Sequence, residues 1–292
     1  LTATIWGMAF VSQSKGMDYM HPFTFNGVRS LIGAAGILVY ILISRKIAGD
    51  KAAKLDWKLN VKAGLLCGIF LTIASTLQQF GIKYTSVGKA GFITTLYIIF
   101  VPMFGIFLKK KVAPVVWAAA GMAAVGMYLL CMTESLRLGA GDIMVFLCAI
   151  AFAIQIMTVD HYAARIDGAV VSCIQFTVCG VVCCIGALIW GQPTFGQIQE
   201  GLGALLYAGV LSCGVGYTLQ IVGQKGLNPT VAALIMSLES VIATISGWIA
   251  YKIGFLSTDQ TLTPRQIVGC VIVFAAVILV QLPPEWFRFG KK

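Results

Sequence analysis

The stretch LQQFGIKYTSVGKAGFITTL, residues 77–96, has a counterpart in LQIVGQKGLNPTVAALIMSL, residues 219–238. At a constant offset of 142 positions, seven of the twenty aligned residues are identical, and the first four are Leu77, Gln78, Gly81 and Lys83. Apolar helices align by chance through Leu, Ile and Ala, but a shared Gln, Gly and Lys at fixed spacing is not explained in that way. We therefore predict an internal repeat, in which Tyr97 aligns with Glu239.

Ten apolar runs organise the chain around these two stretches. They lie at 1–11, 22–44, 61–82, 87–108 and 113–132 in the first half, and at 142–159, 169–190, 201–222, 229–251 and 265–282 in the second. Most approach the roughly 20 residues that a helix needs to cross a bilayer. None alternates with a period of two, as a lipid-facing barrel requires. The first run is short, and we expect the natural chain to continue before it.

Composition places this chain in lipid. It is 59% hydrophobic and 11% charged, whereas soluble domains carry roughly 25% charged residues. There is too little polar surface to cover a water-soluble protein of 292 residues. We expect an all-α protein that is integral to the cytoplasmic (plasma) membrane.

The predicted repeat unit contains five spans, an odd number, so its second copy must cross the membrane in the opposite direction. We expect ten transmembrane helices in two inverted-topology units, 1–135 and 140–284, around a central cavity, with a basic tail at 285–292. Inverted repeats recur in secondary transporters because the two units can exchange conformations, which opens a central site to each side in turn.

Basic residues predict the orientation of the spans. Fourteen of the 21 Lys and Arg residues lie in the connections after the even-numbered runs and in the tail, against six in the other connections, and Arg29 lies inside a run. Cytoplasmic loops carry the excess of Lys and Arg. The sequence therefore places both termini in the cytoplasm.

Several functional classes are disfavoured by what the sequence lacks. The net charge of +10 comes from residues in short loops between apolar runs, so we expect no nucleic-acid partner. Nine Cys residues inside apolar runs and two His residues indicate neither a disulfide framework nor a zinc site. The sequence contains no HExxH, G-x-S-x-G or P-loop motif, so we expect no metal, no cofactor, no enzyme and no direct use of ATP.

Polar side chains inside the apolar runs are the candidate site residues. A charge at the centre of a membrane helix costs roughly 2.5–3.5 kcal/mol on insertion scales, so such residues face a cavity or a partner. Glu239 is the strongest candidate, as a cation partner, a protonation switch or a structural carboxylate. We expect its helix to begin at Asn228-Pro229 and to reach the membrane midplane without interruption. Arg29 is a second candidate, with snorkelling or a structural bond as the alternative.

Uncharged candidates complete the set. Gln78 and Gln220 occupy equivalent repeat positions and either line a path or form interhelical hydrogen bonds. Tyr97 aligns with Glu239, so both are expected near the midplane. Trp6 and Gln155 are weaker candidates for the same substrate-binding cavity, since Trp in membrane proteins is commonly an interfacial anchor.

Several stretches of this sequence resemble a known protein family. The stretch 77–93, the following Leu96–Pro102 segment, Trp6-Gly7 and Arg29 are similar to EamA-type proteins of the drug/metabolite transporter superfamily. In the second half, Leu238-Glu239-Ser240, Gly247-Trp248 and the segment from Thr263-Pro264 to Gly269 are also similar. The resemblance covers essentially the whole chain and implies a ten-helix transporter with a central cavity.

The resemblance has two departures. Ser240 stands where the family usually has Pro, and Tyr251-Lys252 replaces a common Gly-Glu, which leaves the geometry of the ninth helix open. The family carries many unrelated solutes. We expect a secondary transporter of a small metabolite, such as an amino acid or a related polar or amphipathic solute, driven by a proton or ion gradient or by none. The alternatives are a membrane scaffold or receptor that transports nothing, and an intramembrane enzyme.

Overall fold

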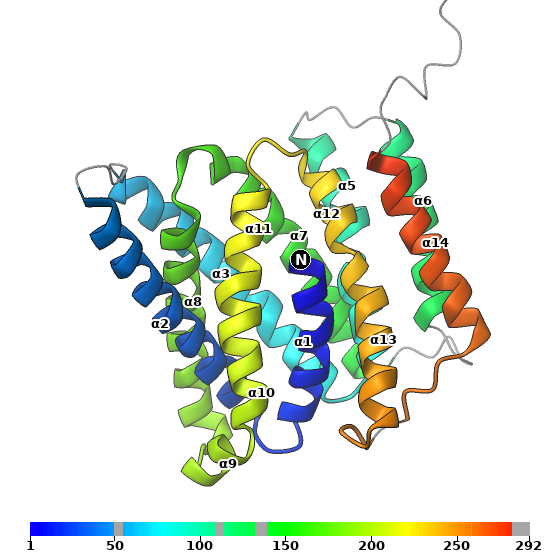
Figure 1. Ribbon diagram of the computed structural model, residues 1–292, viewed down its shortest axis with the longest axis horizontal. Coiled ribbons are helices and arrows are strands. Elements are labelled where there is room, and N and C mark those ends of the chain that lie inside the picture. Colours follow the sequence, from blue (N-terminus) through cyan, green and yellow to red (C-terminus); the bar gives the residue numbers. More distant parts are fainter. Residues whose placement is uncertain (50–54, 109–113, 132–138, 258, 282–292) are drawn as a thin grey trace, which may run out of the picture.

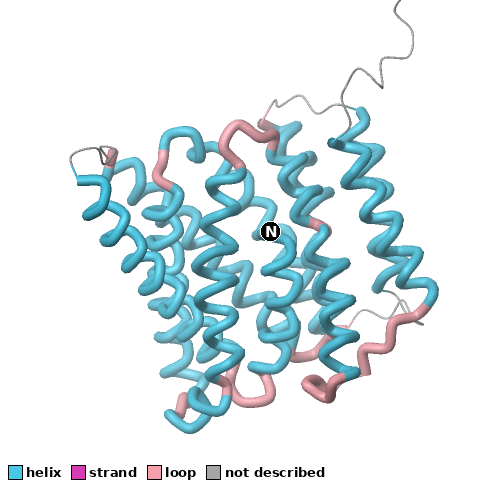
Figure 2. The backbone as a smooth tube through the Cα atoms, in the orientation of Figure 1, coloured by secondary structure: helices cyan, strands magenta, loops and turns pink. Residues whose placement is uncertain are grey.

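The computed structural model describes residues 1–49, 55–108, 114–131, 139–257 and 259–281. Across these residues it consists of helices and connecting loops, with no strand (Figure 2). Within the described ranges, seven helical stretches are long and apolar enough to cross a membrane, and Pro114–Leu129 and Pro264–Leu279 are shorter apolar helices. The predicted all-α membrane architecture is therefore confirmed in outline. The basic tail at 285–292 and the Lys109–Lys111 run lie outside the described residues.

The first half contains six helices. They are α1 (Thr2–Gly16), α2 (Pro22–Ala48), α3 (Trp57–Ile82), α4 (Val87–Thr95), α5 (Tyr97–Phe107) and α6 (Pro114–Cys131). Side chains cap several of these helices at their beginnings: Asp56 accepts from the N–H of Leu59, and Ser86 from that of Lys89. Such bonds satisfy N–H groups that have no partner in the first turn of a helix.

The second half is more interrupted. Its helices are α7 (Ala140–Tyr162), η2 (Ala163–Arg165), α8 (Gly168–Gly186), η3 (Ala187–Gly191), α9 (Phe195–Glu200), α10 (Leu202–Leu206), η4 (Tyr207–Gly216), α11 (Tyr217–Gly223), α12 (Pro229–Met236), α13 (Leu238–Lys252) and α14 (Pro264–Gln281). The segments η3 and η4 are π-helical. π-Helical turns are rare in proteins, and those that occur are often found at functional sites.

The expectation that the Glu239 helix is uninterrupted was wrong. The run 229–251 is divided at Ser237 into α12 and α13, and the run 87–108 is divided at Leu96 into α4 and α5. Near each division a side-chain hydroxyl donates a hydrogen bond to the backbone carbonyl three residues earlier. The Thr95 hydroxyl donates to the carbonyl of Phe92 at 2.9 Å, and the Ser237 hydroxyl to that of Leu234 at 2.7 Å. Local bonds of this type compete with the helical pattern and bend helices. The division leaves Glu239 in the first turn of α13, where unpaired N–H groups favour a negative charge.

The helices pack as a bundle with one pair to the side. Helices α1, α2, α3, α7, α8 and α13 form the body, and α6 packs against α14 at one edge (Figure 1). Helix α2 packs along α8, α3 along α7, and α1 along α13. Large apolar side chains such as Leu42, Leu188 and Val271 remain exposed on the outside. A lipid-embedded surface accounts for this, since soluble monomers rarely expose such extensive apolar patches.

The loop between α1 and α2 is stabilised by aromatic contacts. The His21 ring lies 5.5 Å from that of Phe80, and His21 Nδ1 accepts a hydrogen bond from the N–H of Phe23. Burial, together with the nearby Lys83 ammonium, lowers the pKa of His21 below its ordinary value. A neutral imidazole is the form that can accept this bond.

Candidate substrate cavity

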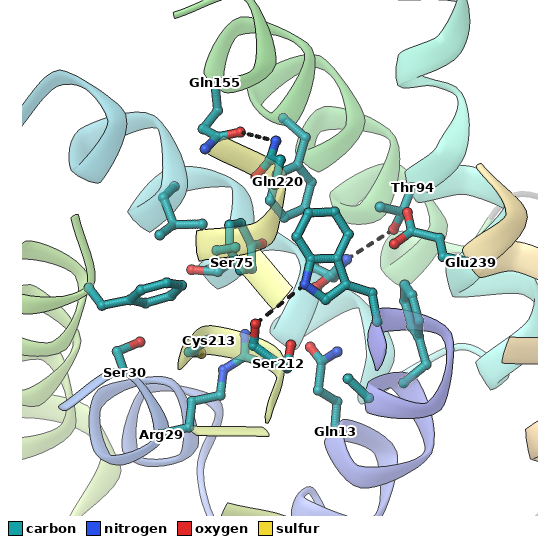
Figure 3. Close-up of a pocket in the computed structure, with 18 of the residues that line it drawn as sticks. Gln13, Arg29, Ser30, Ser75, Thr94, Gln155, Ser212, Cys213, Gln220 and Glu239 are labelled. Carbon is teal, nitrogen blue, oxygen red and sulfur yellow. Dashed lines mark hydrogen bonds between the residues drawn. The ribbon is translucent and has the colours of Figure 1, made fainter. Parts of the chain in front are cut away.

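A buried cavity lies between the helices of the two halves (Figure 3). The structure brings seven predicted residues to this one cavity, namely Trp6, Arg29, Gln78, Tyr97, Gln155, Gln220 and Glu239. They come from seven different helices: α1, α2, α3, α5, α7, α11 and α13. Residues distant in sequence thus converge because each is a polar or amphipathic side chain excluded from the lipid-facing side of its helix.

Glu239 and Tyr97 form a contact between the halves. The Tyr97 hydroxyl donates a hydrogen bond to Glu239 Oε1 at 3.0 Å. Both side chains are buried, with 3% of Glu239 and 2% of Tyr97 exposed. The predicted internal repeat aligns Tyr97 with Glu239, so that alignment pairs two residues that meet in space. Within the described residues, no Lys, Arg or His lies within ion-pair distance of the Glu239 carboxyl.

Gln220 and Gln155 begin a chain of hydrogen-bonded side-chain amides beside the cavity. Gln220 Nε2 donates to Gln155 Oε1 at 3.2 Å, and Gln155 Nε2 approaches Gln175 Oε1 at 3.5 Å. In the first half of the chain, Gln78 Nε2 donates to the Thr94 hydroxyl at 3.2 Å. Gln78 and Gln220, which the predicted repeat aligns, therefore have different partners. Among the described residues, the buried Oε1 of Gln220 has none.

An aromatic wall adjoins these amides. The rings of Trp6 and Tyr217 lie 4.5 Å apart, and the Phe176 ring meets Tyr217 edge-on at 5.0 Å. Trp6 Nε1 points to the carbonyl of Ser212 at 3.4 Å, inside the π-helical segment η4. Trp6 is partly buried inside the bundle and faces the cavity. The cavity therefore combines an apolar, aromatic wall with polar groups, as sites for amphipathic small molecules do.

Arg29 is the one arginine in the cavity lining, on the side away from Glu239 (Figure 3). Its side chain is 5% exposed, and its guanidinium lies over the Phe25 ring at 5.4 Å from the centroid. The ion pairs among the described residues are Lys15–Asp18 and Lys89–Asp142, so Arg29 takes part in none. Its Nε has no hydrogen-bond partner there either. The neighbours do not neutralise this charge.

Sequence reasoning missed several polar residues of the lining. They are Gln13, Ser30, Ser75, Thr94 and Ser212. Gln13 lies beyond the predicted end of the first run, whereas α1 continues to Gly16. Ser and Thr are common in membrane helices. Which of them face the cavity depends on how each helix is rotated about its axis, and the sequence does not show that rotation. A longer first span would have included Gln13.

A second, larger cleft lies apart from the central cavity. It measures about 590 Å³ and is bordered by Arg45, Asp56, Arg165, Asp167 and Lys225, near the beginning of α8 and the end of α11. The central cavity measures about 40 Å³. The basic side chains of the larger cleft belong to the connections predicted as cytoplasmic, and the rule for cytoplasmic loops accounts for them.

Comparisons with known proteins agree with this architecture. The model of the EamA-like transporter family matches residues 1–132 and 139–282. An uncharacterized transporter of Archaeoglobus fulgidus is 27% identical over 97% of this chain and 84% of its own, and the uncharacterized transporter YwfM of Bacillus subtilis is 24% identical over 98% and 93%. A protein of known crystal structure superposes with a TM-score of 0.71 at 17% identity, covering 98% of this chain and 99% of that one.

The fold, the apolar surface and these matches together define a membrane transporter. The chain belongs to the EamA-like transporter family, as its sequence motifs predicted.

Proposed function

We propose that this protein is a secondary transporter that moves a small polar or amphipathic metabolite through the central cavity by alternating access. The observation that carries the proposal is the cavity itself. It is buried, it is lined from both halves of the chain, and it combines Glu239, Arg29 and several amides with an aromatic wall. A scaffold has no need of so many polar groups inside a membrane bundle, because each is costly to bury there.

The proposed architecture is ten spans in two inverted five-helix units, 1–135 and 140–284. The twofold match of the family model supports this division. The pairing of helix contacts supports it as well. Under the proposed equivalence, the contact of α1 with α13 corresponds to that of α7 with α5, and the contact of α2 with η4 corresponds to that of α8 with α3. The pairs α2–α8 and α6–α14 join equivalent helices.

The size of the cavity supports a mechanism with more than one conformation. Sites for small molecules commonly occupy about 300–1,000 Å³, and the central cavity measures about 40 Å³. A metabolite therefore needs the helices around the cavity to separate. The turns at Leu96 and Ser237 divide two helices next to Tyr97 and Glu239, and divided helices at the binding site are a feature of transporters built from inverted repeats.

The proposed setting is the cytoplasmic membrane with both termini inside. The driving force is a proton or another ion, or the solute gradient alone, because the sequence contains no P-loop for ATP. Glu239 is the candidate proton carrier, since it is a buried carboxyl group that lines the cavity.

Flux measured in proteoliposomes tests the proposal. Purified protein is reconstituted, and uptake of radiolabelled small metabolites, including amino acids, is followed with and without an imposed pH gradient. We expect saturable uptake of at least one solute above protein-free vesicles. Saturable binding of a solute without its flux would favour a receptor instead.

A further inference from the structure

We propose that Arg29 is an anion-binding residue of the central cavity, and that the transported solute carries a single carboxylate which pairs with it. This inference rests on the proposed transport function and narrows the class of solute. It begins from the charge of Arg29, which is buried in the bundle with 5% of its surface exposed. A guanidinium remains protonated in proteins, so the charge is present in every state of the cavity.

The described part of the chain places no carboxylate against this charge. No carboxylate among the described residues lies within ion-pair distance of Arg29, and its Nε has no hydrogen-bond partner. The guanidinium lies over the Phe25 ring at 5.4 Å from its centroid; such a ring attracts a cation but carries no negative charge to balance it. A buried cation without an anion is unfavourable, and such residues in membrane spans mark sites for substrates or ions.

The position of the side chain directs the charge to the cavity. Arg29 reaches from α2 toward Ser212 and Cys213, beside the space that Trp6 and Gln13 also border (Figure 3). Gln13 Oε1 and Gln220 Oε1 are buried acceptors without partners, so further hydrogen bonds are available to a polar solute. The planar guanidinium donates two parallel hydrogen bonds, which match a carboxylate.

The remaining charges of the cavity favour a monoanion. Arg29 is the one basic residue in the lining, and Glu239 is the one acidic residue. A phosphate dianion would bring two negative charges to one guanidinium and would be repelled by an ionised Glu239. A single carboxylate balances Arg29 and leaves Glu239 free to remain neutral or to bind a cationic group of the same solute.

The test measures binding to the purified protein in detergent by thermal denaturation. The probes are carboxylates, each paired with the amide that lacks the carboxylate charge: butyrate and butyramide, benzoate and benzamide, and leucine and leucinamide. Sodium chloride serves as a simple anion. A ligand that binds the folded protein raises its melting temperature. The variants are Arg29→Gln and Arg29→Lys, and Arg165→Gln is the control because Arg165 is exposed outside the cavity.

We expect at least one carboxylate to raise the melting temperature of the wild type by about 2 °C or more, with no effect of its amide. Arg29→Gln should bind that carboxylate at least about tenfold more weakly, Arg29→Lys should retain part of the effect, and Arg165→Gln all of it. Equal stabilisation of wild type and Arg29→Gln would overturn the proposal, as would the absence of any difference between carboxylates and amides. Stabilisation by chloride equal to that by carboxylates would overturn it too, and would indicate a structural anion.

Stability without ligand provides a second measurement. Because no described residue forms an ion pair with Arg29, Arg29→Gln should melt at the same temperature as wild type or higher. Replacing a structural arginine bonded to helix ends would instead lower the melting temperature. A clearly lower melting temperature in Arg29→Gln together with unchanged carboxylate binding would contradict the assignment. Flux of uncharged solutes without carboxylate binding would refute the role of Arg29 and leave transport standing. Carboxylate binding without any flux would refute transport alone.

Discussion

At the scale of single residues, polarity inside apolar runs was the useful signal. Glu239, Arg29 and Gln78 stand out in the sequence because their neighbours are apolar, and the structure brings them to one cavity. The sequence did not predict their partners. The bond from Tyr97 to Glu239, and the lack of a described partner for Arg29 Nε, depend on side-chain geometry across helices. A sequence pattern does not encode that geometry directly.

Replacing Glu239 by Gln should change transport without unfolding the protein. Gln has nearly the shape of Glu, and its Oε1 can still accept the hydrogen bond that Tyr97 donates at 3.0 Å. It cannot bind or release a proton. In proteoliposomes we expect Glu239→Gln to lose the pH dependence of flux, with a melting temperature close to that of wild type.

Glu200→Gln is the matched control for that measurement. Glu200 is an exposed carboxylate at the end of α9, outside the cavity lining. Its replacement should leave both flux and pH dependence unchanged. If Glu239→Gln also transports like wild type at every pH, Glu239 is a structural residue and coupling resides elsewhere.

At the scale of helices, the sequence predicted where the apolar runs lie but not how they are interrupted. The runs 87–108 and 229–251 read as continuous apolar segments, yet turns at Leu96 and Ser237 divide them. A hydroxyl side chain that bonds a nearby carbonyl accompanies each turn. Whether a Ser or Thr bonds in this way depends on its rotamer, which an apolar pattern does not specify.

Gly81 and Gly223, which the predicted repeat aligns, should respond differently to replacement by Ala. A Cβ on Gly81 would clash with Val145 and lie 2.8 Å from the carbonyl oxygen of Gly141, because α3 and α7 pack closely there. A Cβ on Gly223 would meet nothing within 4 Å. We expect Gly81→Ala to destabilise the protein by about 1–3 kcal/mol.

Gly223→Ala serves as the control and should be neutral or slightly stabilising, since Ala favours a helix over Gly by up to about 1 kcal/mol. Melting temperatures of both purified variants measure the difference. Similar losses in the two would show that the close approach of α3 and α7 is wrong.

The ion pair between Lys89 and Asp142 should hold α4 to the beginning of α7. Lys89 Nζ lies 2.5 Å from Asp142 Oδ2, and Asp142 also accepts from the Thr85 hydroxyl and the N–H of Gly139, both at 2.9 Å. Asp142 is 4% exposed. We expect Asp142→Asn to lower the free energy of unfolding by about 1–3 kcal/mol, because Lys89 loses its counter-charge.

An exposed pair supplies the comparison. Lys15 Nζ and Asp18 Oδ2 lie 3.0 Å apart, but the Asp18 side chain is 48% exposed. Asp18→Asn should cost about 0–1 kcal/mol, as water screens such pairs. Equal effects of Asp142→Asn and Asp18→Asn in thermal melts would argue against a stabilising role for the buried pair.

At the scale of the whole molecule, composition predicted a protein embedded in lipid, and the length of the apolar runs without a period of two predicted helices. The reason is physical. An apolar surface of this extent is stable only in lipid, and in lipid every backbone N–H and C=O group must form its hydrogen bond within the protein. The narrow cavity was not predictable, because the sequence is compatible with states in which the halves are closer or further apart.

Orientation of the chain gives the last prediction. The basic residues place the beginning of α3 on the cytoplasmic side and the end of α13 outside, and in the structure these ends lie on opposite faces of the bundle (Figure 1). Lys58 and Lys252 are both exposed there. In a variant without its native cysteines, Lys58→Cys should react with a membrane-impermeant thiol reagent only after the cells are opened, and Lys252→Cys in intact cells.

The pair of positions tests both the orientation and the inverted repeat. Lys58 precedes the third predicted span and Lys252 follows the ninth, so an odd number of crossings, seven, separates them if all ten runs cross the membrane. Labelling of both from the same side would mean that an even number of crossings lies between them, and the ten-span topology would then be wrong. Labelling in the reverse sense would retain ten spans but place both termini outside, so the excess of Lys and Arg would face away from the cytoplasm.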